Sequence, residues 1–217
     1  MTKKERALLA IERLKGLYPE AVCSLTYKHP YELLISTRLS AQCTDARVNI
    51  VTEVLFEKYP TLESLAHAEY DDIEQIVRPC GLGKTKARDI IMMSNQLIDN
   101  YNGVVPDTIE ELLKLSGIGR KTANLVVGDV YGKPSIVTDT HCIRICGRLG
   151  LTDGSTVPLA VENQLRKILP PEEGGDFCHR LVHFGREWCM ARNPRCEACP
   201  LSDICKNKTK NDKRKGR

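Results

Sequence analysis

The stretch that decides the fold is "LSGIGRKTANLV" (residues 115–126). Two glycines, Gly117 and Gly119, flank the apolar residue Ile118, and helix-forming residues follow them. Because glycine adopts backbone conformations that other residues avoid, Gly-X-Gly allows a sharp turn, which the apolar side chain can pin. The turn leaves the first N–H groups of the next helix without intrahelical partners. The stretch therefore predicts two helices joined by a tight hairpin.

A second stretch, "CGLGKTKA" (residues 80–87), repeats this pattern 36 residues earlier, with Gly81 in the place of Gly117. We interpret both stretches as helix-to-helix turns. An internal duplication and two independent tight turns account for the similarity equally well. The letters "GLGKT" also resemble the end of an ATP-binding Walker A loop. That motif requires a preceding strand and a glycine where this chain has Arg78, so we exclude it.

Helical periodicity dominates the rest of the chain. Apolar residues recur at intervals of three and four, and no convincing period-two run appears. Behind Pro106, either Asp107 or Thr108 can cap a helix, with an acidic residue three positions later. The clearest examples of this period are Leu8, Ile11, Leu14 and Leu17, then Val48, Val51 and Leu55. We assign a further face, Phe177, Leu181, Phe184 and Trp188, to core packing. The sequence predicts an all-α protein of about ten short helices.

The composition indicates an ordinary globular chain. Its 217 residues are enough to bury a core, and its apolar runs fall short of the roughly 18 residues of a membrane span. The N-terminus is charged and amphipathic, without the apolar centre of a signal peptide. We therefore expect a cytoplasmic protein with reduced thiols and no membrane partner.

The net charge of +4 comes from one end of the chain. The tail "KNKTKNDKRKGR" (residues 206–217) holds seven Lys or Arg and one Asp, so the remainder has 25 basic and 27 acidic side chains. A binding site for a polyanion must therefore be a local arrangement of donors. We expect the tail to be a disordered basic arm, which either adds salt-sensitive affinity for a polyanion or is only a solvated end.

The hairpin at residues 115–126 has the chemistry of a phosphate site. Free N–H groups at a helix N-terminus attract anions, and a nucleic-acid backbone bound there would be positioned without its sequence being read. A purely structural turn is the alternative. Lys121 would lie in the first helical turn, where the helix dipole and the guanidinium of Arg120 favour an uncharged, nucleophilic amine. Asp139, in "VTDTHC", offers a carboxylate, although it could serve only as a helix cap.

Four cysteines lie close together near the C-terminus, with six, two and five residues between them. They are Cys189, Cys196, Cys199 and Cys205. Four thiolates can bind either a zinc ion or an iron-sulfur cube, and the spacing leaves both open, although zinc ribbons usually pair two short Cys-x2-Cys knuckles. We assign the other six cysteines, at positions 23, 43, 80, 142, 146 and 178, to packing.

Taken together, these motifs resemble the endonuclease III family of helix-hairpin-helix DNA glycosylases and abasic-site lyases. The stretches that support the resemblance are "LSAQCTD" (39–45), "GLGKTKA" (81–87), "LSGIGRKTANLV" (115–126) leading into "VTDTH" (137–141), and the four-cysteine cluster. They follow the family's order and span nearly the whole chain. The cysteine spacing is the family's own, and it implies a [4Fe-4S] cluster that acts as a structural clamp.

The resemblance implies a two-lobed fold. A six-helix barrel with the helix-hairpin-helix motif would span residues 21–133, and residues 1–20 with 134–205 would form a discontinuous iron-sulfur cluster domain. Double-stranded DNA containing damaged pyrimidines or abasic sites would be the partner, and the damaged base would be flipped out of the stack. The family further implies a monomer that acts at the nucleoid in base excision repair.

The resemblance also implies roles for single residues. Lys121 matches the family's nucleophile, whose Schiff base with the sugar leads to β-elimination on the 3′ side, and Asp139 matches the catalytic carboxylate. Gln42 and Leu82 match two side chains that enter the duplex; otherwise Gln42 is a surface residue and Leu82 the buried pin of its turn. The phosphate-holding turn is Gly117, Ile118 and Gly119, and possible pocket residues are Asp45 and His141.

The chain departs from the family pattern at one position, and two other functions compete with the one that the resemblance implies. The family usually has proline where this chain has Ser116, so we expect a looser start to the helix after the hairpin. Adenine glycosylases of the same superfamily generally lack the lysine at position 121 and have a further C-terminal domain, which argues against that activity here. A non-catalytic DNA-binding or electron-transfer protein would share the hairpin and the cluster but would not react with DNA.

Overall fold

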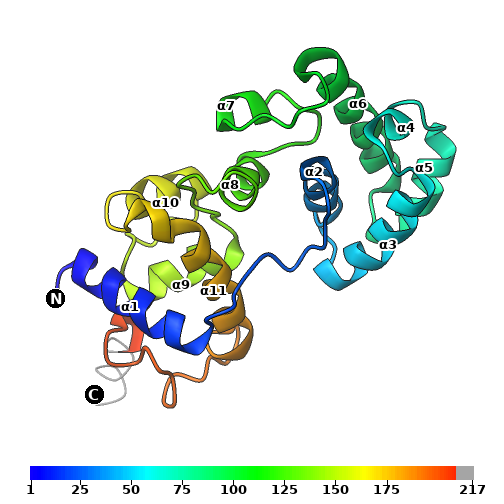
Figure 1. Cartoon of the computed structure of the whole chain (residues 1–217). Helices are drawn as coiled ribbons and strands as arrows, with labels where there is room; N and C mark the ends of the chain where they lie inside the picture. The colour runs from blue at the N-terminus through cyan, green and yellow to red at the C-terminus, as the bar shows by residue number, and fades with distance from the viewer. Residues whose placement is uncertain (209–217) are drawn as a thin grey trace. The chain divides into compact units, whose positions relative to one another are not determined.

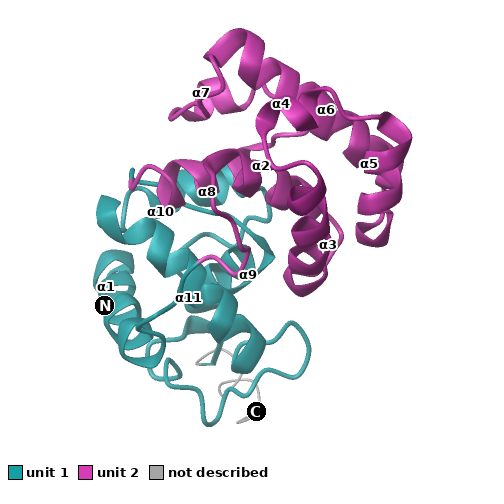
Figure 2. Cartoon of the chain, turned by 45° about the vertical axis from the view of Figure 1, so that its right-hand side comes forward, with its two compact units in different colours: residues 1–22, 133–217 teal, residues 23–132 magenta. Residues whose placement is uncertain are grey.

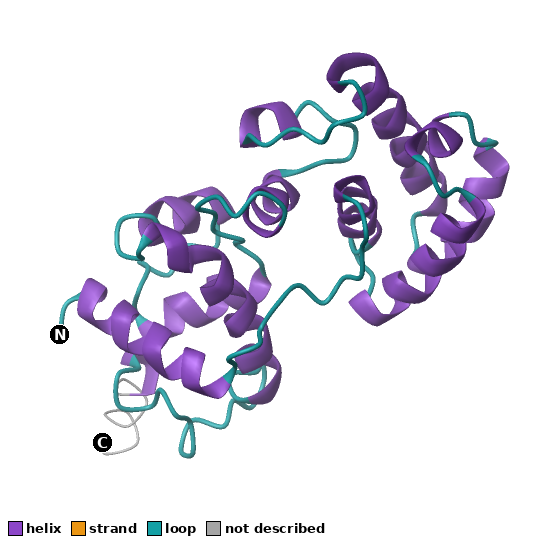
Figure 3. Cartoon of the chain, in the orientation of Figure 1, coloured by secondary structure: helices purple, strands orange, loops and turns teal. Residues whose placement is uncertain are grey.

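A computed structural model describes residues 1–208 of the chain. Within these residues every regular element is a helix and no strand is present, so the all-α prediction is confirmed (Figure 1, Figure 3). In this part of the chain, no helix has the length and apolar character needed to cross a membrane. Residues 206–208, predicted as the start of a disordered tail, have helical backbone, and the rest of the tail lies outside the described residues.

The chain divides into two compact units (Figure 2). Unit 2 is the continuous segment Cys23–Gly132, and unit 1 combines Met1–Val22 with the chain from Lys133 onward. Unit 2 contains α2 (Pro30–Leu39), α3 (Asp45–Lys58), α4 (Leu62–Ala66), α5 (Tyr70–Val77), η1 (Arg78–Cys80), α6 (Gly83–Tyr101), α7 (Ile109–Leu112) and α8 (Arg120–Asp129). Unit 1 contains α1 (Lys3–Leu17), α9 (Thr140–Leu149), α10 (Pro158–Leu165), η2 (Pro171–Glu173) and α11 (Gly174–Glu187).

In unit 2, the helix α6 is the element against which α4 and α5 pack. Its buried face includes Ala87, Ile90, Met93 and Leu97, spaced at three and four residues as a helix requires. Side-chain caps set the starts of several helices. Thr108 is the N-cap of α7 and accepts a hydrogen bond from the N–H of Glu111, so the cap predicted behind Pro106 is Thr108 rather than Asp107.

In unit 1, the helix α11 packs against both α1 and α9. Phe177, Leu181 and Phe184 on α11 are buried, which confirms the predicted core face, and Trp188 at its end is half-buried. The helix α1 is tied to the cysteine segment by Arg6, which donates to the carbonyl of Ile204 at 2.8 Å. The N-terminal helix therefore supports the segment that holds the four cysteines.

Candidate active site and cluster site

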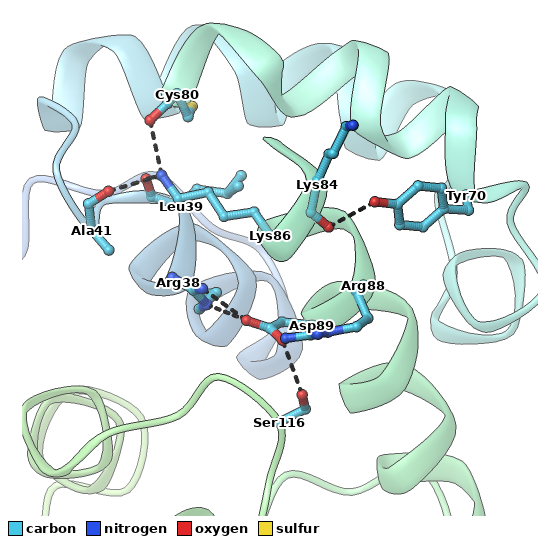
Figure 4. Close-up of polar contacts among 10 residues, drawn as sticks. All are labelled: Arg38, Leu39, Ala41, Tyr70, Cys80, Lys84, Lys86, Arg88, Asp89 and Ser116. Carbon is cyan, nitrogen blue, oxygen red and sulfur yellow. Dashed lines mark hydrogen bonds and ion pairs between the residues drawn. The ribbon is translucent and has the colours of Figure 1, made fainter. Parts of the chain in front are cut away.

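The hairpin before α8 rests on a buried ion pair in unit 2. Arg38 of α2 donates through Nε and Nη2 to Oδ2 of Asp89 on α6, with both distances 2.8 Å (Figure 4). Only 13% of the Arg38 side chain and 6% of the Asp89 side chain are exposed. Gly117 lies directly over this pair, at a φ of +73° that disfavours any residue with a Cβ. Position 117 therefore requires glycine for two reasons: the positive φ, and the close approach of the backbone to the Arg38–Asp89 pair.

Ser116 ties the hairpin to the same pair. Its Oγ donates to the second oxygen of Asp89 at 3.2 Å (Figure 4). Its N–H donates to Oε1 of Gln96 at 2.7 Å. A proline at this position could make neither bond, because it lacks both the hydroxyl and the N–H. The looser start to the following helix stays a prediction, and the structure shows that the serine holds the hairpin with two hydrogen bonds that proline could not make.

The hairpin presents Lys121 in the first turn of α8. Gly119 is the N-cap, so no side chain is available there to cap the first N–H groups of the helix. Ile118 is 7% exposed and pins the turn as predicted, while Lys121 is exposed. The hairpin therefore places an accessible amine in the first turn of a helix whose N-terminus has no side-chain cap, and such a terminus attracts anions.

Asp139 lies in unit 1 and is half-buried. It is the N-cap of α9, and its Oδ1 accepts the N–H of Cys142 at 2.7 Å. The capping role that the sequence left open is therefore present. It fixes the carboxylate at the start of α9 and does not use the whole hydrogen-bonding capacity of the group, because a carboxylate offers about four acceptor positions.

Gln42 and Leu82 share an unusual backbone. Their φ angles are +59° and +54°, in the left-handed region that costs a residue with a Cβ of order 1 kcal/mol or more. Both side chains are exposed, Leu82 by 52%. Leu82 is therefore not the buried pin of its turn, unlike Ile118 at the equivalent place of the second hairpin. Strained backbone that holds exposed side chains outward is typical of functional sites.

Lys86 is not among the site residues predicted from the sequence. It is 0% exposed, and its Nζ donates to three backbone carbonyls: Leu39 and Ala41 at 2.8 Å, and Cys80 at 2.9 Å (Figure 4). Burial lowers the pKa of this ammonium, while the neighbouring thiols act in the opposite sense. The signal was present in the sequence, because Lys86 falls on the same helical face as Ile90, Met93 and Leu97.

The two possible pocket residues have local partners. Asp45 is the first residue of α3 and accepts a hydrogen bond from Oγ of Ser24. His141 accepts a hydrogen bond at Nδ1 from Nη2 of Arg144, one turn later on α9. A Cβ at Gly185 of α11 would lie 2.3 Å from that ring nitrogen, so α9 and α11 approach closely there. Each residue thus has a structural role within its own unit.

Cys189, Cys196, Cys199 and Cys205 all line one pocket of unit 1, together with Ile145, Arg148 and Trp188. Arg148 of α9 holds the cysteine segment by donating to the carbonyls of Met190 at 2.7 Å and Ala191 at 3.0 Å. Its Nη1 also lies 3.4 Å from Sγ of Cys189. The hydrogen bonds from Arg148 to these carbonyls therefore fix the backbone of the cysteine segment independently of the group that the thiols bind.

The donor chemistry of this pocket suits an iron-sulfur cluster. Burial, and then the neighbouring thiols of the other three cysteines, raise the pKa of Cys199 to about 11. Four thiolates in one pocket require compensating positive charge, which iron supplies. Among the described residues, no group of three or more His, Cys, Asp or Glu side chains is placed to hold a metal ion, so the structure shows a shared pocket rather than a closed ligand set.

The other cysteines divide into two groups. Cys80, Cys142, Cys146 and Cys178 are buried, as their assignment to packing predicts. Cys23 and Cys43 are only half-buried, so part of each side chain is exposed to solvent and does not pack in the core. Burial raises the pKa of Cys23 to about 11, which keeps it protonated near neutral pH.

Comparison with known families identifies both parts of this arrangement. Residues 35–171 match the family described as "HhH-GPD superfamily base excision DNA repair protein". Residues 189–205, which begin and end at cysteines of the cluster, match the iron-sulfur binding domain of endonuclease III. The expected [4Fe-4S] cofactor is thereby confirmed.

Individual relatives align over nearly the whole chain. Endonuclease III of Bacillus subtilis (strain 168) is 41% identical over 204 residues, which are 94% of this chain and 93% of that protein. Endonuclease III of Escherichia coli (strain K12) is 37% identical over 209 residues, 96% of this chain and 99% of that protein.

Solved structures give the same result. A trapped endonuclease III–DNA covalent intermediate has a TM-score of 0.91 and 43% identity, and the match covers 98% of this chain and 100% of that one. A thermostable thymine-DNA glycosylase, 22% identical with a TM-score of 0.86 over 95% of this chain and 98% of that one, shares the fold. By sequence match and by structural similarity, this chain belongs to the endonuclease III family of helix-hairpin-helix base excision DNA repair proteins.

Proposed function

We propose that Lys121 is the nucleophile of this enzyme, that Asp139 is its catalytic carboxylate, and that its substrate is duplex DNA containing an oxidised pyrimidine or an abasic site. Membership of the family makes the protein a DNA-binding base excision repair enzyme, a bifunctional DNA glycosylase and abasic-site lyase. The observation that supports the proposal most directly is the exposed amine of Lys121 in the first turn of α8, directly after a rigid, glycine-capped hairpin.

The proposed reaction begins at the sugar. The amine of Lys121 attacks C1′ of the flipped nucleotide, the glycosidic bond breaks, and the base leaves with the bonding electron pair and takes up a proton from solvent. The carboxylate of Asp139 stabilises the positive charge that develops on the sugar and accepts the proton that the amine loses. The sugar ring then opens to a Schiff base, whose iminium acidifies C2′. Loss of a C2′ proton expels the 3′ phosphate, which breaks the strand.

The hairpin and the two strained loops would position the substrate. Backbone N–H groups around Gly117, Ile118 and Gly119 would hold a phosphate near the lesion. Gln42 would fill the space left by the flipped base and hydrogen-bond to the orphaned partner, while Leu82 would wedge the opposite strand. Their exposure and left-handed backbone support these roles, because both side chains are directed away from the core at a conformational cost.

Cys189, Cys196, Cys199 and Cys205 would hold the cluster, with Arg148 fixing the backbone between the first two. The chemistry that the cluster supplies when bound is ligation: it closes small loops in a segment too poor in apolar residues to fold by itself. The protein's own residues complete the support, since Arg6 and Arg13 of α1 donate to carbonyls of Ile204 and Pro200.

Reductive trapping tests the nucleophile. With sodium borohydride and a duplex containing an abasic site or a thymine glycol, the wild-type protein should become covalently joined to the DNA, and Lys121→Gln should not. Lys114→Gln is a matched control, because Lys114 is an exposed lysine whose Nζ pairs with Glu111 before the hairpin. Cross-linking by the Lys121→Gln variant would assign the reaction to another amine. Tight binding without cleavage by the wild type would leave only a DNA-binding scaffold.

Substrate range, oligomeric state and location are also proposals. A panel of duplexes with thymine glycol, uracil mispairs and normal pairs should show preferential excision of the oxidised pyrimidine. Light scattering should give the mass of a single chain, 24.3 kDa. In a bacterial cell, a fluorescent fusion should lie with the nucleoid in the cytoplasm, and a uniform distribution that ignores DNA damage would contradict this.

A further inference from the structure

The buried ammonium of Lys86 joins three segments of unit 2 that are distant in sequence. Leu39 is the last residue of α2, Ala41 lies in the loop that follows, and Cys80 ends the 3-10 turn η1. The acceptors on α2 and its loop are 47 and 45 residues away from Lys86. Because an ammonium has three N–H donors and three carbonyls accept from it, the charge is buried with every donor satisfied.

The bonded carbonyls stand next to the two strained residues. Ala41 directly precedes Gln42, and Cys80 lies two residues before Leu82. The same Nζ therefore anchors the loop of Gln42 and the turn of Leu82 to one point on α6. Neither of these residues packs in the core itself, since both side chains are exposed. Their placement depends on backbone anchors of this kind.

We propose that Lys86 is a positioning residue, which holds Gln42 and Leu82 together so that both enter the duplex in one event. The proposal rests on the proposed function, because it takes these two side chains as the ones that fill and wedge the DNA. Lys86 does not touch the substrate: its side chain is 0% exposed, and its donors are all used by carbonyls.

Tyr70 gives the turn of Leu82 a second anchor. Its hydroxyl donates to the carbonyl of Lys84 at 3.0 Å, just after Leu82 (Figure 4). The Tyr70 hydroxyl anchors only the turn of Leu82, whereas the Lys86 ammonium donates hydrogen bonds to both the loop of Gln42 and the turn of Leu82. The loss of Lys86 should therefore uncouple the two loops, while each loop keeps part of its own structure.

The experiment compares an abasic site in a duplex with the same site in a single strand. A single strand has no opposite base to fill or wedge, so its cleavage requires Lys121 but not the paired loops. Lys86→Met is one atom shorter and removes the donors. It should slow single-turnover cleavage of the duplex by about 10-fold to 100-fold and leave the single-strand rate within about threefold of wild type. Equal losses on both substrates would overturn the proposal.

A matched control separates positioning from loss of stability. Leu97 is 1% exposed on the same helix and packs in the core, so Leu97→Ala destabilises α6 without removing an anchor of either loop. It should affect both substrates equally. If Lys86→Met does not fold, Lys86→Gln serves in its place, because its shorter amide still donates, and it should give a smaller loss confined to the duplex.

A double-mutant cycle provides the second readout. In a protein that already contains Gln42→Ala and Leu82→Ala, the additional change Lys86→Met should alter duplex cleavage by less than about twofold, because there is nothing left to position. If Lys86→Met slows duplex cleavage by the same factor in this background as in the wild type, the proposal is overturned. Failure of the proposed function gives a different result: the wild-type protein would then cleave neither substrate and would form no borohydride adduct.

Discussion

Replacing Gly117 with alanine should destabilise the hairpin far more than equivalent changes nearby. A Cβ built at Gly117 lies 2.7 Å from Cδ and Nε of Arg38 and 2.9 Å from Oδ2 of Asp89. These atoms belong to the buried ion pair and cannot swing into solvent. The positive φ costs about 1–3 kcal/mol. Displacing Arg38 weakens charged hydrogen bonds worth about 1.5–3 kcal/mol each. We therefore expect a total loss of about 3–6 kcal/mol in the free energy of unfolding.

Two other glycines act as controls that separate the cost of the positive φ from the cost of the clash with the ion pair. Gly81 has nearly the same φ, +74°, but a Cβ there would have no neighbour within 4 Å, so Gly81→Ala should cost only the backbone contribution of about 1–3 kcal/mol. Gly119 has a φ of −103° and open space around it, so Gly119→Ala should cost about 1 kcal/mol or less.

Urea unfolding followed by helical circular dichroism measures the series. With a slope of about 1–3 kcal/mol per molar urea, the midpoint should fall by about 1 M or more for Gly117→Ala and by less for the two controls. In an Arg38→Met background, the cost of Gly117→Ala should shrink, because the clash is then with a flexible apolar chain. Equal destabilisation by Gly117→Ala and Gly81→Ala would refute the close contact that we infer between the hairpin and the ion pair.

Three further predictions concern the carboxylate, the cluster and the response to pH. Asp139→Asn keeps an oxygen for the N–H of Cys142, so its unfolding free energy should stay within about 1 kcal/mol of wild type while lyase turnover falls by about 100-fold or more; parallel losses would mean that the residue is only a cap. Purified wild type should contain about four irons with matching sulfide, Cys199→Ser less than half of that, and Cys23→Ser the full amount; stoichiometric zinc would contradict the cluster. Hydrogen bonds from Lys58 and then Tyr59 lower the pKa of Asp72, so the stability that this carboxylate contributes is present above its ordinary pKa near 3.8 and is lost as the pH falls through its lower folded value. Asp72→Asn should therefore be less stable than wild type at pH 7 and converge with it in acid, and a constant difference would contradict the linkage.

Sequence patterns within a few residues of one another predicted much of the molecule. The apolar period of three and four predicted the helices, because a helix places such residues on one face. The Gly-X-Gly turns at residues 81 and 117 predicted tight corners, and both glycines have positive φ. The four-cysteine spacing narrowed the cofactor to two candidates, and only the resemblance of the whole chain to a family chose between them. All of these features are local, so the chain itself fixes them.

Tertiary structure decided the burial of residues that look alike in sequence. Leu82 and Ile118 occupy the same place in two similar turns, yet Leu82 is 52% exposed and Ile118 only 7%. Lys86 lies on the apolar face of its helix, but only the folded structure supplies the three carbonyls that allow its charge to be buried. The partners responsible come from elsewhere in the chain, as the Lys86–Leu39 bond across 47 residues shows. Burial and long-range hydrogen bonds depend on which segments meet in the folded protein, whereas helices and turns depend on neighbouring residues.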